Sequence, residues 1–177
     1  MKKEAIVLRY GHRLWRDERV TTHCCLVARA FGAKKIIIVG ETQKDLEDTV
    51  TKIVEKWGNG FKLEFTNSWT KSLGELKKQG FTIIHLTMYG VPINKIQKKL
   101  KGINRVCFVI GAKKVERKVF EESSYNVSIG TQPHSEIAAL AIALDRFFSG
   151  KELEKSFSKA KLKIIPRNRG KKVEKIQ

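Results

Sequence analysis

The sequence is poor in cysteine and contains no long apolar run, which excludes several classes of protein. Only three cysteines occur among 177 residues, none with CxxC spacing, and the adjacent Cys24 and Cys25 cannot easily bridge each other. A disulfide framework is therefore excluded, and a reduced, cytoplasmic protein is expected. No apolar run approaches the roughly 18 residues of a membrane span, and charge returns at Arg9 too early for a signal peptide. The four scattered histidines lack metal-site spacing, so no metal is expected.

Acidic residues are scarce relative to basic ones. The chain has 18 Asp and Glu against 36 Lys and Arg, a net charge of +18. Solubility alone needs a far smaller imbalance, whereas a field of this sign attracts polyanions. A phosphate-rich partner, with nucleic acid favoured, is the prediction. An anionic membrane ranks lower, because no helical pattern pairs a strong apolar stripe with a purely basic face.

Short aliphatic runs alternate with helical patterns along the chain. This alternation predicts an α/β fold with a mainly parallel sheet flanked by helices. The predicted strands are Ala5–Leu8, Lys35–Val39, Phe61–Phe65, Thr82–Thr87, Val106–Ile110 and Asn126–Ile129. The predicted helices are His23–Phe31, Gln43–Trp57, Trp69–Lys78, Ile93–Lys101 and Ile137–Phe148. We expect a single domain over 1–177, with a basic β-hairpin extension at 160–177.

Three late strands each end in a glycine, at Gly90, Gly111 and Gly130. Ligands of open α/β sheets bind beyond the carboxyl ends of the strands, and glycine lets a ligand approach main-chain amides closely. No GxGxxG follows the first strand and no GxxxxGK[ST] occurs, so dinucleotide and nucleoside triphosphate sites lose support. From these turns alone, a ligand site and three ordinary strand–helix connections remain equally open.

A set of motifs in a fixed order runs through most of the chain. They are VLRYGHR from Val7, RDERVTTH from Arg16, ARAFGA from Ala28, HLTMYG from His85, GAKKV from Gly111, YNVSIG from Tyr125, QPHSE from Gln132 and RGKKV from Arg169. In order and spacing these motifs resemble the archaeal tRNA (cytidine(56)-2'-O)-methyltransferase family.

This resemblance implies a SPOUT fold with a deep C-terminal trefoil knot, a homodimer, a tRNA substrate and S-adenosylmethionine as methyl donor. It also implies that the donor is held by the three glycine turns. The implied donor-binding residues are Leu86, Gly111, Ala112, Lys113, Lys114, Val115, Ile129, Gly130, Thr131, Gln132, Pro133, His134, Ser135 and Glu136. The sequence departs from the family's pattern at Lys113, Glu116 and Thr131.

The implied reaction moves a methyl group from a sulfonium to a ribose 2'-oxygen, so the protein must align two atoms and help a hydroxyl lose its proton. Resemblance to related knotted enzymes points to arginines of the N-terminal part: Arg19 as catalytic residue, Arg13 and Arg16 as substrate-binding residues. Because arginine is a poor base, Arg19 is expected to orient a phosphate and the attacking oxygen. A solvated basic face, or an ion-pair network with Asp17, is the alternative.

Several further assignments stay open. His23 is expected to be a packed core or interface residue rather than a base. Met88 and Tyr89 could line an adenine pocket or belong to the core, and Trp15 could stack on a base. The basic tail suits either tRNA backbone contact or a dimer-stabilising hairpin. The competing functions are a non-catalytic basic RNA-binding module and a knotted methyltransferase that acts on another RNA nucleotide.

Overall fold

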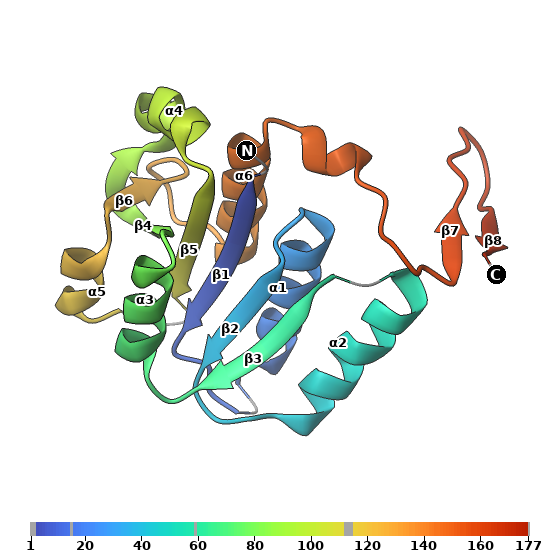
Figure 1. Ribbon diagram of the computed structural model, residues 1–177, viewed down its shortest axis with the longest axis horizontal. Coiled ribbons are helices and arrows are strands. Elements are labelled where there is room, and N and C mark those ends of the chain that lie inside the picture. Colours follow the sequence, from blue (N-terminus) through green and yellow to red (C-terminus); the bar gives the residue numbers. More distant parts are fainter. Residues whose placement is uncertain (1–2, 15, 59, 112–114, 177) are drawn as a thin grey trace.

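The computed structural model describes residues 3–14, 16–58, 60–111 and 115–176. A six-stranded parallel sheet of order β3-β2-β1-β5-β4-β6 carries helices on both faces, and a separate antiparallel hairpin follows it (Figure 1). The strands are β1 Glu4–Tyr10, β2 Lys35–Val39, β3 Lys62–Thr66, β4 Thr82–Pro92, β5 Arg105–Gly111, β6 Tyr125–Ser128, β7 Leu162–Ile164 and β8 Val173–Lys175. The helices are α1 Glu18–Ala30, α2 Lys44–Trp57, α3 Trp69–Lys78, α4 Ile93–Gly102, α5 Arg117–Glu122, α6 Glu136–Phe148 and the 3-10 turn Lys151–Glu154. The predicted fold class and the C-terminal hairpin are confirmed.

The two faces of the sheet are covered unequally. Alternate residues of a strand point to opposite faces, so Val7 of β1 packs with Cys24 of α1 and Leu140 of α6, together with residues of α2 and α4. The next residue, Leu8, packs on the other face with Leu73 of α3 and with α5. Nearly all of these side chains are fully buried. The larger core therefore lies under α1, α2, α4 and α6.

Most element bounds match the predictions, and the exceptions have local causes. The helix α1 begins at Glu18 rather than at His23, because its first turn is polar and is held by Thr21 and Thr22 hydroxyls that donate to backbone carbonyls. The six-residue α5 was not predicted. Within the described part of the chain, no helix has the length and apolar character needed to cross a membrane.

The strand β4 runs on to Pro92, beyond its predicted end. Both Leu86 and Val91 pair with Val127 of β6, so the residues between them leave the ladder and return to it. At Gly90 the backbones come so close that an added Cβ would lie 2.4 Å from the Val127 nitrogen. This approach, rather than an unusual φ, requires glycine there. The trefoil knot implied by the resemblance is consistent with this tight crossing and stays a prediction.

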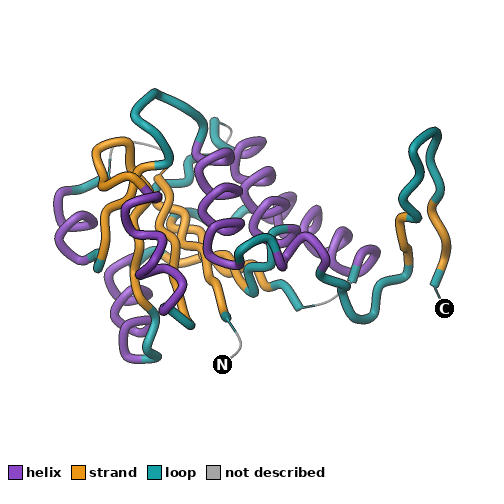
Figure 2. The backbone as a smooth tube through the Cα atoms, turned by 90° about the horizontal axis from the view of Figure 1, so that it is seen from above, coloured by secondary structure: helices purple, strands orange, loops and turns teal. Residues whose placement is uncertain are grey.

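The hairpin β7–β8 stands apart from the sheet (Figures 1 and 2). Its connection to the body lies at the end of α2, where the Lys161 amide donates to the Lys56 carbonyl over 3.1 Å. Beside this point the buried Arg29 of α1 donates to the Gly58 carbonyl over 3.1 Å and stacks over the Phe157 ring at 4.4 Å. The base of the hairpin is thus fixed while its strands are exposed.

Candidate active site

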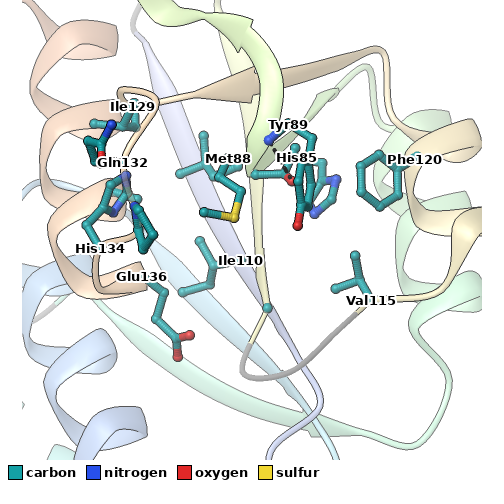
Figure 3. A pocket seen from close by; sticks show the side chains of 15 residues that line it. His85, Met88, Tyr89, Ile110, Val115, Phe120, Ile129, Gln132, His134 and Glu136 are labelled. Atoms are coloured by element: carbon teal, nitrogen blue, oxygen red, sulfur yellow. Dashed lines mark hydrogen bonds between the residues drawn. The ribbon is translucent and has the colours of Figure 1, made fainter.

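A pocket of about 430 Å³ lies at the carboxyl ends of β4, β5 and β6, where the three glycine turns meet (Figure 3). We call it the strand-end pocket. Its described lining residues are His85, Leu86, Thr87, Met88, Tyr89, Ile110, Gly111, Val115, Phe120, Ile129, Gln132, Pro133, His134, Glu136 and Ala139. Its volume falls within the roughly 300–1,000 Å³ typical of small-molecule sites. A mostly apolar wall with a few polar groups is also typical of such sites.

Most of the described residues predicted to bind a donor line this pocket. They are Leu86, Gly111, Val115, Ile129, Gln132, Pro133, His134 and Glu136. Gly130, Thr131 and Ser135 do not line it; the Ser135 hydroxyl instead caps α6 by accepting from the Ile137 amide over 3.2 Å. Ala112, Lys113 and Lys114 lie outside the described residues. The structure therefore brings residues of the three turns together in one pocket, and their role in donor binding stays a prediction.

The prediction of site residues omitted part of the pocket, including His85, Thr87, Ile110, Phe120 and Ala139. Ile110 lies within β5, and Phe120 and Ala139 belong to helices, so none of these three was part of a predicted turn. His85 opens the HLTMYG motif, which was the available signal. Met88 and Tyr89 line the pocket rather than the core, and both are exposed.

A chain of hydrogen bonds fixes the orientation of His85. The Asn126 Nδ2 donates to the Phe120 carbonyl over 3.0 Å, so the Asn126 Oδ1 faces the His85 Nδ1 at 2.9 Å. The His85 Nδ1 must then carry the proton. Burial lowers the pKa of His85, although the hydrogen bond to Asn126 acts in the opposite direction. His85 is therefore a neutral imidazole with an assigned tautomer at neutral pH.

A buried ion pair links the pocket to the centre of the sheet. Arg9 of β1 is fully buried and donates to Glu136 Oε1 from Nε over 3.1 Å and from Nη2 over 2.7 Å. Glu136 is the first residue of α6 and lines the pocket. The pair joins positions 127 residues apart, which no local sequence pattern reveals.

A second contact joins β1 to the turn after β5. The Tyr10 hydroxyl donates a hydrogen bond to the Glu116 carboxylate, and the Tyr10 ring packs edge-on against Trp69. Burial, followed by the hydrogen bond to Glu116, raises the pKa of Tyr10 to about 12. Glu116, one of the departures from the family pattern, precedes α5 and so fixes one end of the turn that contributes Val115 to the pocket.

The predicted arginines lie elsewhere. Arg16 and Arg19 are exposed and line a shallow hollow of about 360 Å³ with Glu18, Thr22 and His23, which we call the arginine hollow. Arg13 lies in neither place: its Nε and Nη2 donate to the two carboxylate oxygens of Asp17 over 2.8 and 3.0 Å. No arginine occurs among the described lining residues of the strand-end pocket.

Expectations from the sequence also concern His23, which lines the arginine hollow, and Trp15, which precedes Arg16 in the chain. For His23, expected in the core or at an interface, the exposed side chain excludes the core, and an interface role stays a prediction. Trp15 lies outside the described residues.

No cluster of three or more metal-ligating side chains occurs in the described ranges.

The fold is that of the SpoU and TrmH methyltransferases, the SPOUT class. The structure described as an A. aeolicus TrmH/SpoU tRNA modifying enzyme matches with a TM-score of 0.65 and 15% identity, over 87% of this chain and 78% of that one. The SpoU methyltransferase AviRb from Streptomyces viridochromogenes, solved in complex with the cofactor AdoMet, matches with a TM-score of 0.61 and 11% identity. The latter match covers 85% of this chain and 58% of that one.

Sequence similarity specifies the family within this class. Residues 57–174 match the family described as tRNA ribose 2'-O-methyltransferase, aTrm56. The tRNA (cytidine(56)-2'-O)-methyltransferase of Thermococcus kodakarensis is 51% identical over 177 residues, covering 98% of both chains. That of Methanocaldococcus jannaschii is 49% identical over 170 residues, covering 94% of both. The chain belongs to the tRNA ribose 2'-O-methyltransferase family, and the predicted resemblance is confirmed.

Proposed function

We propose that this protein transfers a methyl group from S-adenosylmethionine to the ribose 2'-oxygen of cytidine 56 in tRNA, in the cytoplasm. The observation that carries the proposal is the strand-end pocket, which gathers three motif turns of this family at the carboxyl edge of the sheet. The relatives with near-complete coverage bear this activity in their names. Three free cysteines suit a reducing compartment.

The residues of the strand-end pocket fit the methyl donor. Leu86, Ile110 and Ile129 offer apolar surface for a purine, and Gln132 offers a polar group at the rim. The donor-binding residues of the proposal are therefore the described lining residues, with Gly130, Thr131 and Ser135 shaping the turn. When bound, the donor supplies an electrophilic methyl group on a sulfonium. The protein has to exclude water and align the methyl with the ribose oxygen.

The substrate side of the proposal rests on charge. The chain carries +18, and the hairpin extension at 160–177 is strongly basic, with most of its described residues exposed. Contacts to phosphates fix the register of an RNA without reading its sequence. We assign Arg19 to orient a phosphate and the attacking ribose, with Arg16 and Arg13 as substrate-binding residues nearby. The Arg13 guanidinium is already paired with Asp17, so Arg13 is expected to contribute least of the three arginines to tRNA binding.

A homodimer belongs to the same proposal. The helix α6 is apolar nearly all round, and such helices are normally buried. Yet its Ile142 is exposed, as is Val20 on the adjacent α1, with relative exposures of 42% and 37%. A second copy of this chain that covers α1 and α6 would bury both residues. It would also bring a second arginine hollow toward the pocket that lacks arginine in its described lining.

A methyl-transfer assay with labelled S-adenosylmethionine and an unmodified tRNA transcript tests the function. Label on the ribose of cytidine 56 is the expected result, and a transcript with 2'-deoxycytidine at that position should take up none. Label on another nucleotide would contradict the assigned target while keeping the chemistry. No label, together with no donor binding by calorimetry, would favour a non-catalytic RNA-binding module. Sedimentation of the free protein tests the dimer.

A further inference from the structure

Arg9 is the largest fully buried side chain in the described structure, and its position needs a reason. It is 0% exposed, on the central part of the sheet between Ile38 of β2 and Ile110 of β5. Its partner Glu136 is 19% exposed at the side chain. Burying such a pair costs desolvation that its attraction rarely exceeds, so stability alone does not account for it. A well-packed apolar residue would serve the core at least as well.

The geometry leaves one oxygen of Glu136 free. Both hydrogen bonds from Arg9 go to Oε1, and no described residue donates to Oε2. Glu136 is one of the residues that line the strand-end pocket. In Figure 3 it points away from the apolar side chains of Ile129 and Met88, beyond Ile110. The Ser135 cap holds the first turn of α6, so the backbone of Glu136 is fixed as well.

We propose that Glu136 accepts the proton of the attacking ribose hydroxyl at Oε2, and that Arg9 is the positioning residue that turns this oxygen to the pocket. This proposal rests on the proposed function. In the step, the 2'-oxygen forms a bond to the methyl carbon, the carbon–sulfur bond gives its electron pair to sulfur, and the hydroxyl proton passes to Oε2. The proton then leaves to water.

The other titratable groups of the pocket are less suited. His85 is 2% exposed, donates from Nδ1 to Asn126 and packs against the Phe120 ring. His134 is exposed in the turn and hydrogen-bonds through Nδ1 to the neighbouring Ser135 carbonyl, so no distant element holds its ring. Tyr89 is 82% exposed. Glu136 is the acidic residue among the described lining residues, and Arg9 of β1 holds its carboxylate in place.

The variant Glu136→Gln tests the proton transfer with little change of shape. Arg9 has only donors, so the amide should turn its oxygen to Arg9 and its NH2 to the pocket, where it cannot take a proton. In single turnover at saturating donor, we expect the rate to fall by at least about 100-fold. Donor affinity measured by calorimetry should stay within about threefold, because the change removes a transition-state interaction.

A binding measurement provides a readout that does not depend on turnover. With S-adenosylhomocysteine bound, the wild type should bind a tRNA transcript with cytidine at position 56 about tenfold or more tighter than one with 2'-deoxycytidine, since a carboxylate oxygen accepts the hydroxyl. The Glu136→Gln variant should lose this preference. An equal preference in both proteins would overturn the proposal, because Oε2 would then not face the hydroxyl.

Arg9→Lys tests the positioning role. A lysine keeps the charge but cannot make two bonds in the same fixed geometry. We expect a rate reduction of about tenfold or more, a weaker preference for the hydroxyl, and unchanged donor affinity. If the variant only melts earlier and keeps both the rate and the preference, Arg9 is a structural residue. The exposed pair Arg117–Glu121 supplies the control: Glu121→Gln should change nothing.

Three other outcomes of these experiments would each point to a different explanation. If Glu136→Gln weakens donor affinity and regains full rate at saturating donor, Glu136 only holds the donor and takes no proton, and the proposal fails. If His134→Gln loses about 100-fold while Glu136→Gln does not, His134 is the acceptor. A wild-type protein that places no label on cytidine 56 would instead contradict the proposed function, so the two failures are distinguishable.

Discussion

The strand-end pocket and the arginine hollow share no described residue and are built differently. The pocket takes residues from β4, β5, α5 and α6, with the Arg9–Glu136 pair beside it. The arginine hollow comes from a single stretch, Arg16 to His23, and its arginines are exposed. The pocket is therefore a product of tertiary structure, whereas the hollow is a product of one helix start.

This difference separates two tasks of the proposed enzyme. A small donor has to be enclosed and aligned, which requires walls from several elements. A large polyanion only needs charges that can reach its phosphates, and these can stand on a solvated helix end. Changes in the apolar walls and turns of the pocket should therefore lower donor affinity or stability. Changes in the hollow, like Glu136→Gln, should lower turnover at constant donor affinity.

The largest effect is expected at Gly90. Gly90→Ala places a Cβ 2.4 Å from the Val127 nitrogen and 2.6 Å from the Asn126 oxygen, which are backbone atoms of β6 that cannot move independently. We expect a loss of about 3 kcal/mol in the free energy of unfolding. Donor binding should fall below detection, measured by calorimetry and thermal unfolding.

Gly74 of α3 provides the matched control. An added Cβ there has no neighbour within 4 Å, and the position is helical. Gly74→Ala should stabilise the protein by about 0.5–1 kcal/mol. A Gly90→Ala protein with wild-type stability and donor affinity would show that the crossing of β4 and β6 tolerates an extra carbon and does not shape the pocket.

The fold could be predicted from sequence where local signals suffice. The bounds of β2 and α3 match the predictions, because an aliphatic run and a capped amphipathic segment each specify one structure. The extension of β4 to Pro92 could not be predicted, because Val91 and Pro92 are in strand conformation only through pairing with β6. The six-residue α5 is too short to show a period.

The same limit applies to the site. Glycine after an aliphatic run marks Gly111 and Gly130 in the sequence, so the location of the pocket was predictable. Phe120 and Ala139 reach it only through the packing of α5 and α6, and helical residues carry no such mark. Arg9 lies in an aliphatic run, IVLRY, where an arginine normally points to solvent. Only the tertiary contact with Glu136 shows that it is buried.

The second-largest effect is expected at Arg19, where turnover should fall while donor affinity stays constant. Arg19→Lys keeps the charge of the arginine hollow but removes the planar fork that binds phosphate in two bonds. We expect a fall of about 100-fold in the single-turnover rate and no change in donor affinity. Arg117→Lys, on the exposed face of α5, is the control. Full turnover in Arg19→Lys would contradict the assignment, since a bidentate role cannot survive this substitution.

A smaller effect is expected when the pH is lowered, and it should change donor affinity in the pocket but not the arginine hollow. Burial lowers the pKa of His85 below its ordinary 6.5, so the unfolded chain binds the proton first as pH falls. The stability from the neutral imidazole is complete above pH 6.5 and is lost as pH falls through the folded-state pKa. Donor affinity should weaken only as pH falls to and below the folded-state pKa, where the folded protein itself takes up the proton, by at most about tenfold per pH unit.

His12 is the control for this pH effect. Its pKa is also lowered, by burial and then by Arg9, but it contacts Thr21 and Gln43 rather than the pocket. Calorimetric titrations that run from about pH 7.5 down to the lowest pH at which the protein stays folded follow both histidines, because their pKa values lie below 6.5. His85→Gln should flatten the pH dependence of donor affinity, and His12→Gln should not. A wild-type affinity that does not change with pH would show that protonation of His85 does not affect the donor.

The smallest effect is expected at Tyr10, the residue that connects the two regions. Its hydroxyl holds Glu116 at the end of the pocket turn, and the chain beyond it leads to the arginine hollow. Tyr10→Phe removes one hydrogen bond but keeps the ring against Trp69, so donor affinity should fall by about two- to tenfold. Tyr125→Phe is the control, because no described residue hydrogen-bonds its hydroxyl. Reduced turnover at unchanged donor affinity would mean that Tyr10 supports the arginine hollow instead, and that the two regions are coupled through β1.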